Sequence, residues 1–238
     1  MKTFQMSKPE ITHAIFDLDG TLLDSEIIYK QIFIKVMAKI GKVFTDDVYT
    51  AVTGLPRVPA MKIFHKMMAL DGTMTIDDLG NAIDVECQTE LPKSQLMPGV
   101  LRIIRHLASC KIPMAICSGS QRWECNLKLQ NHKEVTDVMA SVVANDDPDI
   151  HEGKPAPDAF LVTMKRFPLP PKSPQNVLVF EDSPNGVRAA VAAGMHVVML
   201  CDSRFFAPPE EVSENIDKVV NSFEEFHPED FGLPSYSH

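Results

Sequence analysis

The sequence predicts an α/β protein in which a doubly wound parallel sheet carries an inserted helical domain, and two observations lead to this fold class. Several short apolar runs recur along the chain with helical segments between them, and the runs are continuous rather than alternating in polarity. Such strands are buried on both faces, as in a parallel sheet covered by helices. Between about residue 26 and residue 91 the runs stop, and apolar residues follow the helical period instead.

The predicted strands are short and alternate with helices. The first lies in HAIFDLDG and runs into a turn at Gly20. Later strands are expected at 113–117, 140–144, 176–182 and 196–201, with a last edge strand at 217–220. Helices are expected in VLRIIRHLAS, DAFLVTMKRF and NGVRAAVAA. Strands that alternate with helices in this way build the right-handed crossovers of a parallel sheet.

The chain divides into a core domain and an insertion. Residues 1–24 and 92–238 are assigned to the α/β core, and residues 25–91 to a helical domain, called the cap below. The alternative is that these extra helices pack against one face of the sheet and form no separate unit.

Composition narrows the classes of partner. The chain has 238 residues, a net charge of −9 and no basic stripe, which excludes a nucleic-acid polymer as partner. A local cationic pocket still permits a small phosphorylated molecule. No apolar run approaches the roughly 18 residues of a membrane span, and the first ten residues lack the apolar run of a signal peptide. The five cysteines show no CxxC spacing, so we expect reduced thiols in a cytoplasmic protein. We also expect a monomer.

Acidic residues follow two of the predicted strands. Asp17 and Asp19 end the first strand, and Glu181 and Asp182 end the run VLVF. Ligands of open parallel sheets bind beyond the carboxyl ends of the strands, where these four residues would meet. Carboxylates brought together repel one another unless a cation or a proton intervenes, and Mg²⁺ prefers such oxygen ligands. Alone, each pair also fits a solvated strand end or a helix N-terminus.

Two further motifs carry groups that suit a phosphate. Ser118 and Gly119 follow the strand at 113–117, where a hydroxyl and backbone N–H groups can donate to phosphate oxygens. The alternative is that Ser118 or Ser120 caps the next helix. In GKPAPD, prolines fix the backbone around Lys154, whose ammonium would neutralise a phosphate or keep a nucleophile ionised.

Taken in order, the stretches FDLDGTLLDSE, CSGS, GKPAPDAF and VFEDSPNGVRAA resemble the haloacid dehalogenase-like hydrolase superfamily. The resemblance covers nearly the whole chain and places the helical insertion where that superfamily has a small cap domain. It is closest to the pseudouridine-5′-phosphatase group and the β-phosphoglucomutase branch. It implies a Rossmann-like core and a Mg²⁺-dependent phosphatase acting on a small phosphorylated metabolite, a nucleotide or sugar phosphate.

The resemblance also implies residue roles. Asp17 would be the nucleophile that becomes an aspartyl-phosphate, and Asp19 the general acid and base. Ser118, Gly119 and Lys154 would hold the phosphoryl group. Asp182 would bind Mg²⁺ together with Asp17 and the backbone carbonyl of Asp19, with Glu181 as an auxiliary acid.

Two other functions stay open at this point. In the β-phosphoglucomutase branch the cap carries a histidine and a lysine, and this chain has Tyr29 and Thr53 at those places, which disfavours a mutase. The cap arginine of that branch matches Arg57, which would then bind substrate; the alternative is an exposed arginine at a helix start. A non-catalytic binding protein on the same fold is the third possibility, favoured only by the departure at Cys117-Ser118-Gly119, where relatives carry threonine and serine.

Overall fold

The structure is a computed structural model that describes residues 9–55, 57–201 and 208–236. The sequence-based prediction about the first ten residues therefore falls mostly outside the described chain. Within the described residues, no helix is both long and apolar enough to cross a membrane.

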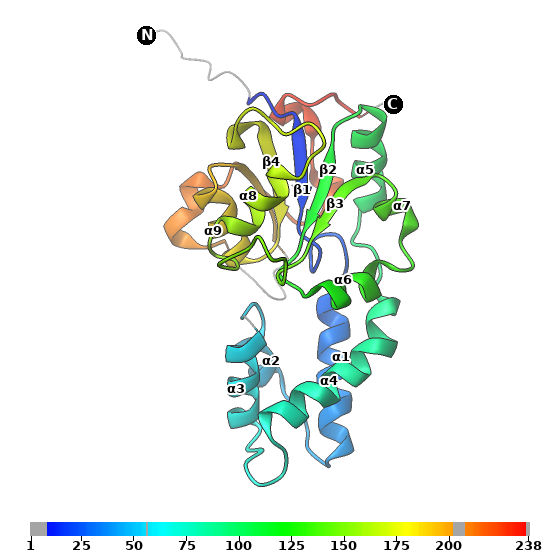
Figure 1. The fold of residues 1–238 in the computed structure, drawn as a ribbon, viewed down its shortest axis with the longest axis vertical. Coiled ribbons are helices and arrows are strands. Elements are labelled where there is room, and N and C mark those ends of the chain that lie inside the picture. Colours follow the sequence, from blue (N-terminus) through cyan, green and yellow to red (C-terminus); the bar gives the residue numbers. More distant parts are fainter. Residues whose placement is uncertain (1–8, 56, 202–207, 237–238) are drawn as a thin grey trace.

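A six-stranded parallel sheet forms the centre of the core domain (Figure 1). Its strands are β1 (His13–Phe16), β2 (Met114–Cys117), β3 (Met139–Val143), β4 (Val177–Glu181), β5 (His196–Leu200) and β6 (Lys218–Val220). Their order in space is β3-β2-β1-β4-β5-β6. The chain therefore winds outward in both directions from β1, which is the doubly wound arrangement that the sequence predicted.

Helices and hydrophobic clusters cover both faces of the sheet. The core helices are α5 (Val100–Ser109), α6 (Arg122–Leu129), α7 (Lys133–Thr136), α8 (Asp158–Lys165) and α9 (Pro184–Ala192). Ala14 and Phe16 of β1 pack into the cluster that contains α5, whereas Ile15 packs on the opposite face with residues of α8 and α9. Because both faces are covered, these three successive residues of β1 are all apolar.

Short 3₁₀ helices connect or follow these elements: η1 (Leu91–Lys93), η2 (Pro174–Asn176), η3 (Glu210–Asn215), η4 (Phe223–Glu225) and η5 (Pro228–Phe231). Phe223 of η4 belongs to the same cluster as Phe16 and Phe180, whose rings stack at a centroid distance of 4.7 Å. The C-terminal segment thereby closes one face of the sheet.

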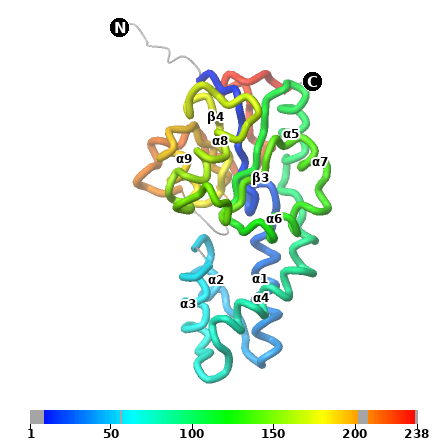
Figure 2. Tube along the Cα trace, in the orientation of Figure 1, coloured from blue at the N-terminus to red at the C-terminus, as the bar shows by residue number. Residues whose placement is uncertain are grey.

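The inserted helices form a second unit with its own hydrophobic cluster. They are α1 (Ser25–Lys39), α2 (Asp46–Val52), α3 (Arg57–Met67) and α4 (Ile76–Glu90). Phe33, Phe44, Tyr49 and Phe64 meet at the centre of this cluster, with ring centroids between 5.1 and 6.4 Å apart. Figures 1 and 2 show these helices below the sheet rather than against a face of it, which agrees with a cap. The exact domain boundaries stay a prediction.

Helix α6 joins the two units. It lies between the sheet and the cap helices in Figure 1, and its Trp123 and Leu127 pack against the cap cluster although the helix belongs to the core. The sequence analysis did not identify α2, α6 or α7, whereas the edge strand β6 and the helices α5, α8 and α9 lie where it predicted them.

Candidate active site

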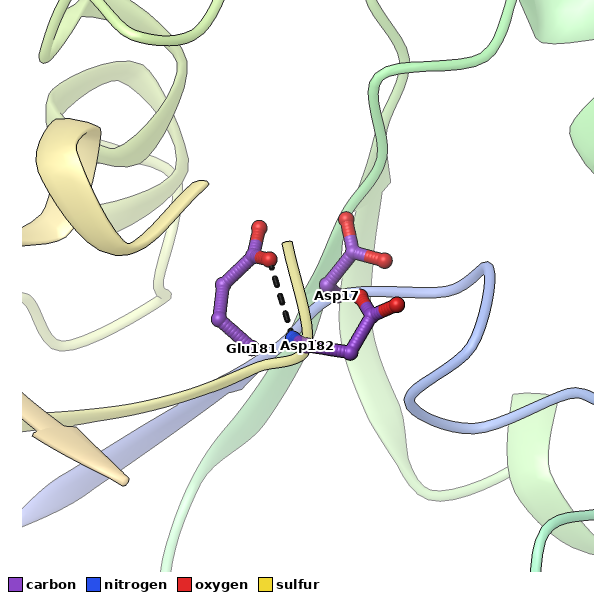
Figure 3. A group of neighbouring side chains, drawn as sticks. All are labelled: Asp17, Glu181 and Asp182. Atoms are coloured by element: carbon purple, nitrogen blue, oxygen red, sulfur yellow. Dashed lines mark hydrogen bonds between the residues drawn. The ribbon is translucent and has the colours of Figure 1, made fainter. Parts of the chain in front are cut away.

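Three carboxylates from two neighbouring strands meet at the carboxyl edge of the sheet. Asp17 follows β1, Glu181 ends β4 and Asp182 follows it. Figure 3 shows the three side chains extending to the same side of the strand ends, and one oxygen of each lies within 4.8 Å of the others. All three residues are buried. The site stands beside β1, where the sheet reverses its direction of winding, and this is where ligands of doubly wound sheets bind.

Lys154 supplies a positive charge in the middle of this cluster. Its Nζ donates to Asp17 Oδ1 and to Glu181 Oε1, both at 2.6 Å, and to the carbonyl oxygen of Cys117 at 3.0 Å. Burial alone would lower the pKa of this lysine, but Asp17 and Glu181 outweigh burial and raise it well above the usual range. Lys154 is therefore ammonium and is held against the predicted nucleophile.

Two glycines allow the acids to approach the backbone. A Cβ at Gly186 would lie 1.8 Å from Glu181 Oε1, and one at Gly20 would lie 2.1 Å from Asp182 Oδ2. The φ of +76° at Gly20 is also in the left-handed region that favours glycine. Gly20, just after the first acidic pair, and Gly186 on α9 therefore stand where a side chain would clash with Asp182 or Glu181.

The cluster is short of positive charge. Burial raises the pKa of Asp17; the Lys154 ammonium opposes that effect, and the Glu181 carboxylate adds to it. Burial likewise raises the pKa of Asp182 well above its usual range, with Glu181 and Asp17 as further causes. A buried group of this kind becomes fully ionised only if a further cation joins it.

The same residues fit a Mg²⁺ ion by the chemistry of their donors. Asp17 and Asp182 offer hard carboxylate oxygens, and Thr21 donates a hydrogen bond of 3.4 Å to Asp182 Oδ1. Glu181 is more heavily engaged, because its Oε2 accepts from the N–H groups of Asp182 and Ser183 and from the Ser183 hydroxyl. Asp17 and Asp182 as the metal ligands and Glu181 as an auxiliary acid stay predictions that this arrangement fits.

Asp19 lies in a different environment from Asp17. Its Oδ1 accepts from Lys128 Nζ at 2.6 Å and from the Ser25 hydroxyl at 2.5 Å, and its Oδ2 accepts from the Ser120 hydroxyl at 2.8 Å. Burial acts to raise the pKa of Asp19, but the Lys128 ammonium and these hydroxyls outweigh burial and lower it. The Asp19 side chain therefore faces α6 and is not one of the three clustered carboxylates; its backbone carbonyl as a metal ligand stays a prediction.

The loop after β2 places Gly119 and Ser120, not Ser118, on the cavity wall. The Ser118 hydroxyl is buried, accepts from the Ser120 N–H at 3.0 Å and donates to Asp19 Oδ2 at 3.4 Å. Neither serine caps α6, whose N-cap is Gln121 in a capping box with Glu124. The predicted contact of Ser118 with phosphate stays a prediction.

A cavity of about 580 Å³ extends from these acids to the cap. Asp17, Asp19, Lys154 and Asp182 line its core end, and the cap lines the other. Arg57 begins α3 and reaches the cavity wall, where its Nη2 pairs with Asp84 Oδ1 at 2.7 Å. Apart from Ser118, the predicted site residues of the core and the cap arginine thus border one cavity.

Sequence reasoning missed Lys128 and Glu124. The side chain of Lys128 is wholly buried and its Nζ lies 4.9 Å from the Tyr29 ring centroid, while Glu124 Oε1 accepts from the Tyr29 hydroxyl at 3.0 Å. The two residues are four apart on α6, and a Glu–Lys pair at that spacing is typical of an exposed helix face. Only the position of α6 between the sheet and the cap (Figure 1) distinguishes this buried pair from a pair on an exposed helix face.

The fold and the acidic site agree with a hydrolase, and the comparison with family models identifies the family of this chain. Residues 14–200 match the model of the haloacid dehalogenase-like hydrolases, and the chain belongs to that family. The predicted family is confirmed.

Relatives with curated names are similar over almost the whole chain. The chain is 39% identical over 226 residues to (DL)-glycerol-3-phosphatase 1, mitochondrial, of Arabidopsis thaliana, covering 95% of this chain and 75% of the relative. It is 36% identical over 229 residues to a probable pseudouridine-5′-phosphatase of Drosophila melanogaster, covering 96% of each. These relatives support the predicted enzyme class, a phosphoric monoester hydrolase.

Solved structures share the fold. A putative β-phosphoglucomutase from Thermotoga maritima superposes with a TM-score of 0.74 at 23% identity, covering 93% of this chain and 97% of that one. A CbbY from Rhodobacter sphaeroides in complex with phosphate gives a TM-score of 0.72 at 21% identity, covering 90% and 96%. At these identities the likeness concerns the fold, and the predicted doubly wound fold class is confirmed.

Proposed function

We propose that the chain is a Mg²⁺-dependent phosphatase that hydrolyses a small phosphate monoester, a nucleotide or sugar phosphate, through an aspartyl-phosphate on Asp17. The observation that carries the proposal is the contact of Lys154 with Asp17 Oδ1 beside Glu181 and Asp182, at the core end of the cavity. Glycerol phosphate and pseudouridine 5′-phosphate are the first substrates to test, because they correspond to the names of the relatives.

In the first chemical step, an Asp17 carboxylate oxygen attacks phosphorus and the bond from phosphorus to the ester oxygen breaks. The leaving alkoxide takes a proton from Asp19, which must first have acquired one. Lys154 lies between Asp17 and Glu181, where its ammonium both favours ionised Asp17 and faces the incoming phosphoryl oxygens. Gly119 and Ser120 border the same end of the cavity, so their polar groups lie on the side that the phosphoryl group enters.

In the second step, water attacks the aspartyl-phosphate, its proton passes to Asp19, and the bond between phosphorus and Asp17 breaks to release phosphate. The described arrangement suits this step, because Lys128, Ser25 and Ser120 hold Asp19 in its basic form.

A Mg²⁺ ion bound by Asp17, Asp182 and the carbonyl of Asp19 would supply positive charge where phosphate meets carboxylate. Without it, the raised pKa values of Asp17 and Asp182 oppose full ionisation of both groups.

Mutase activity is less well supported. Tyr29 and Thr53 border the cavity at the places where that branch carries a histidine and a lysine, and the Tyr29 hydroxyl is engaged with Glu124. The cytoplasmic location and the monomeric state remain parts of the proposal; buried Cys87, Cys117 and Cys125 with free thiols agree with a reducing compartment.

The test is phosphate release from a panel of nucleotide and sugar monophosphates, with Mg²⁺ and with chelator. We expect Mg²⁺-dependent release from at least one ester, and loss of at least about 1000-fold in kcat for Asp17→Asn. Asp137→Asn makes the same chemical change at an exposed residue and serves as the control. Release that survives in Asp17→Asn contradicts the assignment of the nucleophile, and isomerised sugar phosphate in place of free phosphate indicates a mutase.

A further inference from the structure

We propose that the cavity selects phosphate esters whose leaving group is neutral and carries hydroxyls, and that it rejects esters with a second anionic group. The specificity-determining residues are Glu26, Glu124 and the ion pair of Arg57 with Asp84. The inference rests on the proposed phosphatase function and adds the chemical class of the leaving group, which the acids at the sheet edge do not specify.

Glu124 presents a buried carboxylate to the cavity from α6. Its Oε1 accepts from the Tyr29 hydroxyl at 3.0 Å and its Oε2 accepts from the Gln121 N–H at 2.9 Å. An ionised carboxylate has about four lone-pair sites, so each oxygen can accept a further bond. A hydroxyl of the leaving group can therefore donate to Glu124, whereas an anionic group would face like charge with no donor.

Glu26 repeats this arrangement on the first turn of α1. It lines the cavity, and its Oε2 accepts from the Tyr49 hydroxyl at 2.6 Å. Glu26 and Glu124 come from different elements, one of the cap and one of the core, and both point an acceptor at the same space. A ligand with several hydroxyls can donate to both at once.

Among the described residues of the cap, Arg57 is the only cation on the cavity wall, and its guanidinium is already paired with a carboxylate. Its Nη2 pairs with Asp84 Oδ1 at 2.7 Å and lies 3.5 Å from the carbonyl oxygen of Gly80. Only Nη2 of Arg57 takes part in these contacts, so a second phosphate or a carboxylate on the substrate would share this guanidinium with the Asp84 carboxylate and meet its like charge. Asp84 thus masks the group that would otherwise recognise an anion.

Two buried lysines of the described core, Lys154 and Lys128, lie at or near the cavity, and both are also paired. Lys154 contacts Asp17 and Glu181 at the phosphoryl end, and Lys128 contacts Asp19 behind the wall. Much of the remaining cap wall is apolar, with Phe33, Leu55 and Met61 among its residues, and its other polar groups, such as Thr53, are neutral. Such a wall suits the carbon skeleton of a polyol or nucleoside and offers no further cation to a second charge.

Matched pairs of esters isolate this one property. Glycerol 3-phosphate and 3-phosphoglycerate differ only in a hydroxymethyl or carboxylate group at the far end, and glucitol 6-phosphate and 6-phosphogluconate form the same pair with six carbons. We expect kcat/KM, measured with Mg²⁺ as phosphate release, to favour the neutral member by about 100-fold in at least one pair, because uncompensated like charges in a closed site are strongly discriminated.

Two variants test the residues. Asp84→Asn frees Arg57, and Glu124→Gln removes a carboxylate while keeping an acceptor; each should reduce the preference by about tenfold, mainly through a lower KM for the anionic member. Glu134→Gln makes the same change as the second variant on the exposed part of α7 and should leave the ratio unchanged. Thermal unfolding of each variant verifies the fold.

The outcomes separate the two proposals. If the wild-type chain hydrolyses no ester of the panel, the proposed function fails. If it hydrolyses both members of each pair equally well, the function stands and the selection is refuted. If the preference exists but neither variant reduces it, Glu124 and Asp84 do not determine it and the assignment is wrong.

Discussion

The buried ion pair between Lys128 and Asp19 allows a quantitative test of the site. The Lys128 side chain is fully buried and its Nζ lies 2.6 Å from Asp19 Oδ1. In Lys128→Met, the Asp19 carboxylate loses its only ion-pair partner within the described residues, and only 17% of its side chain is exposed to solvent. Removal of one member of a buried pair typically costs about 3–5 kcal/mol, because the remaining charge is uncompensated.

Asp19→Asn in the same chain should recover part of this loss. The double variant has neither buried charge, so we expect its loss of unfolding free energy to be about 1–3 kcal/mol smaller than the sum of the two single losses. Urea unfolding in the presence of chelator measures all four proteins. Trp123 is the only tryptophan and lies on the same helix as Lys128, so its fluorescence reports directly on this region.

Lys133→Met is the matched control, because this lysine is exposed and begins α7, the next helix along the chain. Its substitution should change the unfolding free energy by no more than about 0.5 kcal/mol. Equal stability of Lys128→Met and Lys133→Met, or strict additivity of the Asp19 and Lys128 losses, would refute the reasoning that the pair holds a buried charge.

Two further predictions concern the acidic cluster. Burial raises the pKa of Asp17 from 3.8 to about 8, so the free energy of unfolding of the metal-free chain falls as pH rises from about 4 to 8. Mg²⁺ should therefore raise the unfolding temperature more at pH 8 than at pH 6. Calorimetry that shows the reverse order would contradict this prediction. Gly186→Ala is a change that normally stabilises a helix by up to about 1 kcal/mol. Here it should lower the affinity for Mg²⁺ about 10–100-fold, because the new Cβ would lie 1.8 Å from Glu181 Oε1. Titration calorimetry measures this affinity, and an unchanged value would contradict the predicted clash.

The acids at the strand ends could be predicted because their position follows from short-range rules. Asp17 and Asp182 come directly after continuous apolar runs, and the carboxyl ends of parallel strands share one edge of the sheet. The start of α9 could also be predicted from the sequence. Ser183 accepts from the Gly186 N–H as the N-cap, and Pro184 occupies the first helical position. In each case the information lies within a few residues of the feature.

The environment of Asp19 could not be predicted in this way, because it depends on contacts across long stretches of sequence. Ser25 comes from the start of the cap, whereas Ser120 and Lys128 come from the core about a hundred residues later. Nothing in RWECNLKL reveals that one face of this short helix lies beneath the cap. The same limit applies to Arg57, whose partner Asp84 belongs to a different cap helix.

Two buried lysines give the two aspartates of the first motif opposite properties. Asp17 shares Lys154 with Glu181 and lies close to Asp182, so it is under-compensated and its pKa is raised. Asp19 has Lys128 and three hydroxyl groups within reach, so its pKa is lowered. Environments that separate the pKa values of neighbouring acids are the usual means of assigning them different tasks. In the proposed mechanism, the under-compensated aspartate would gain a cation and a phosphoryl group, whereas the compensated one is already in the form that would take a proton from water.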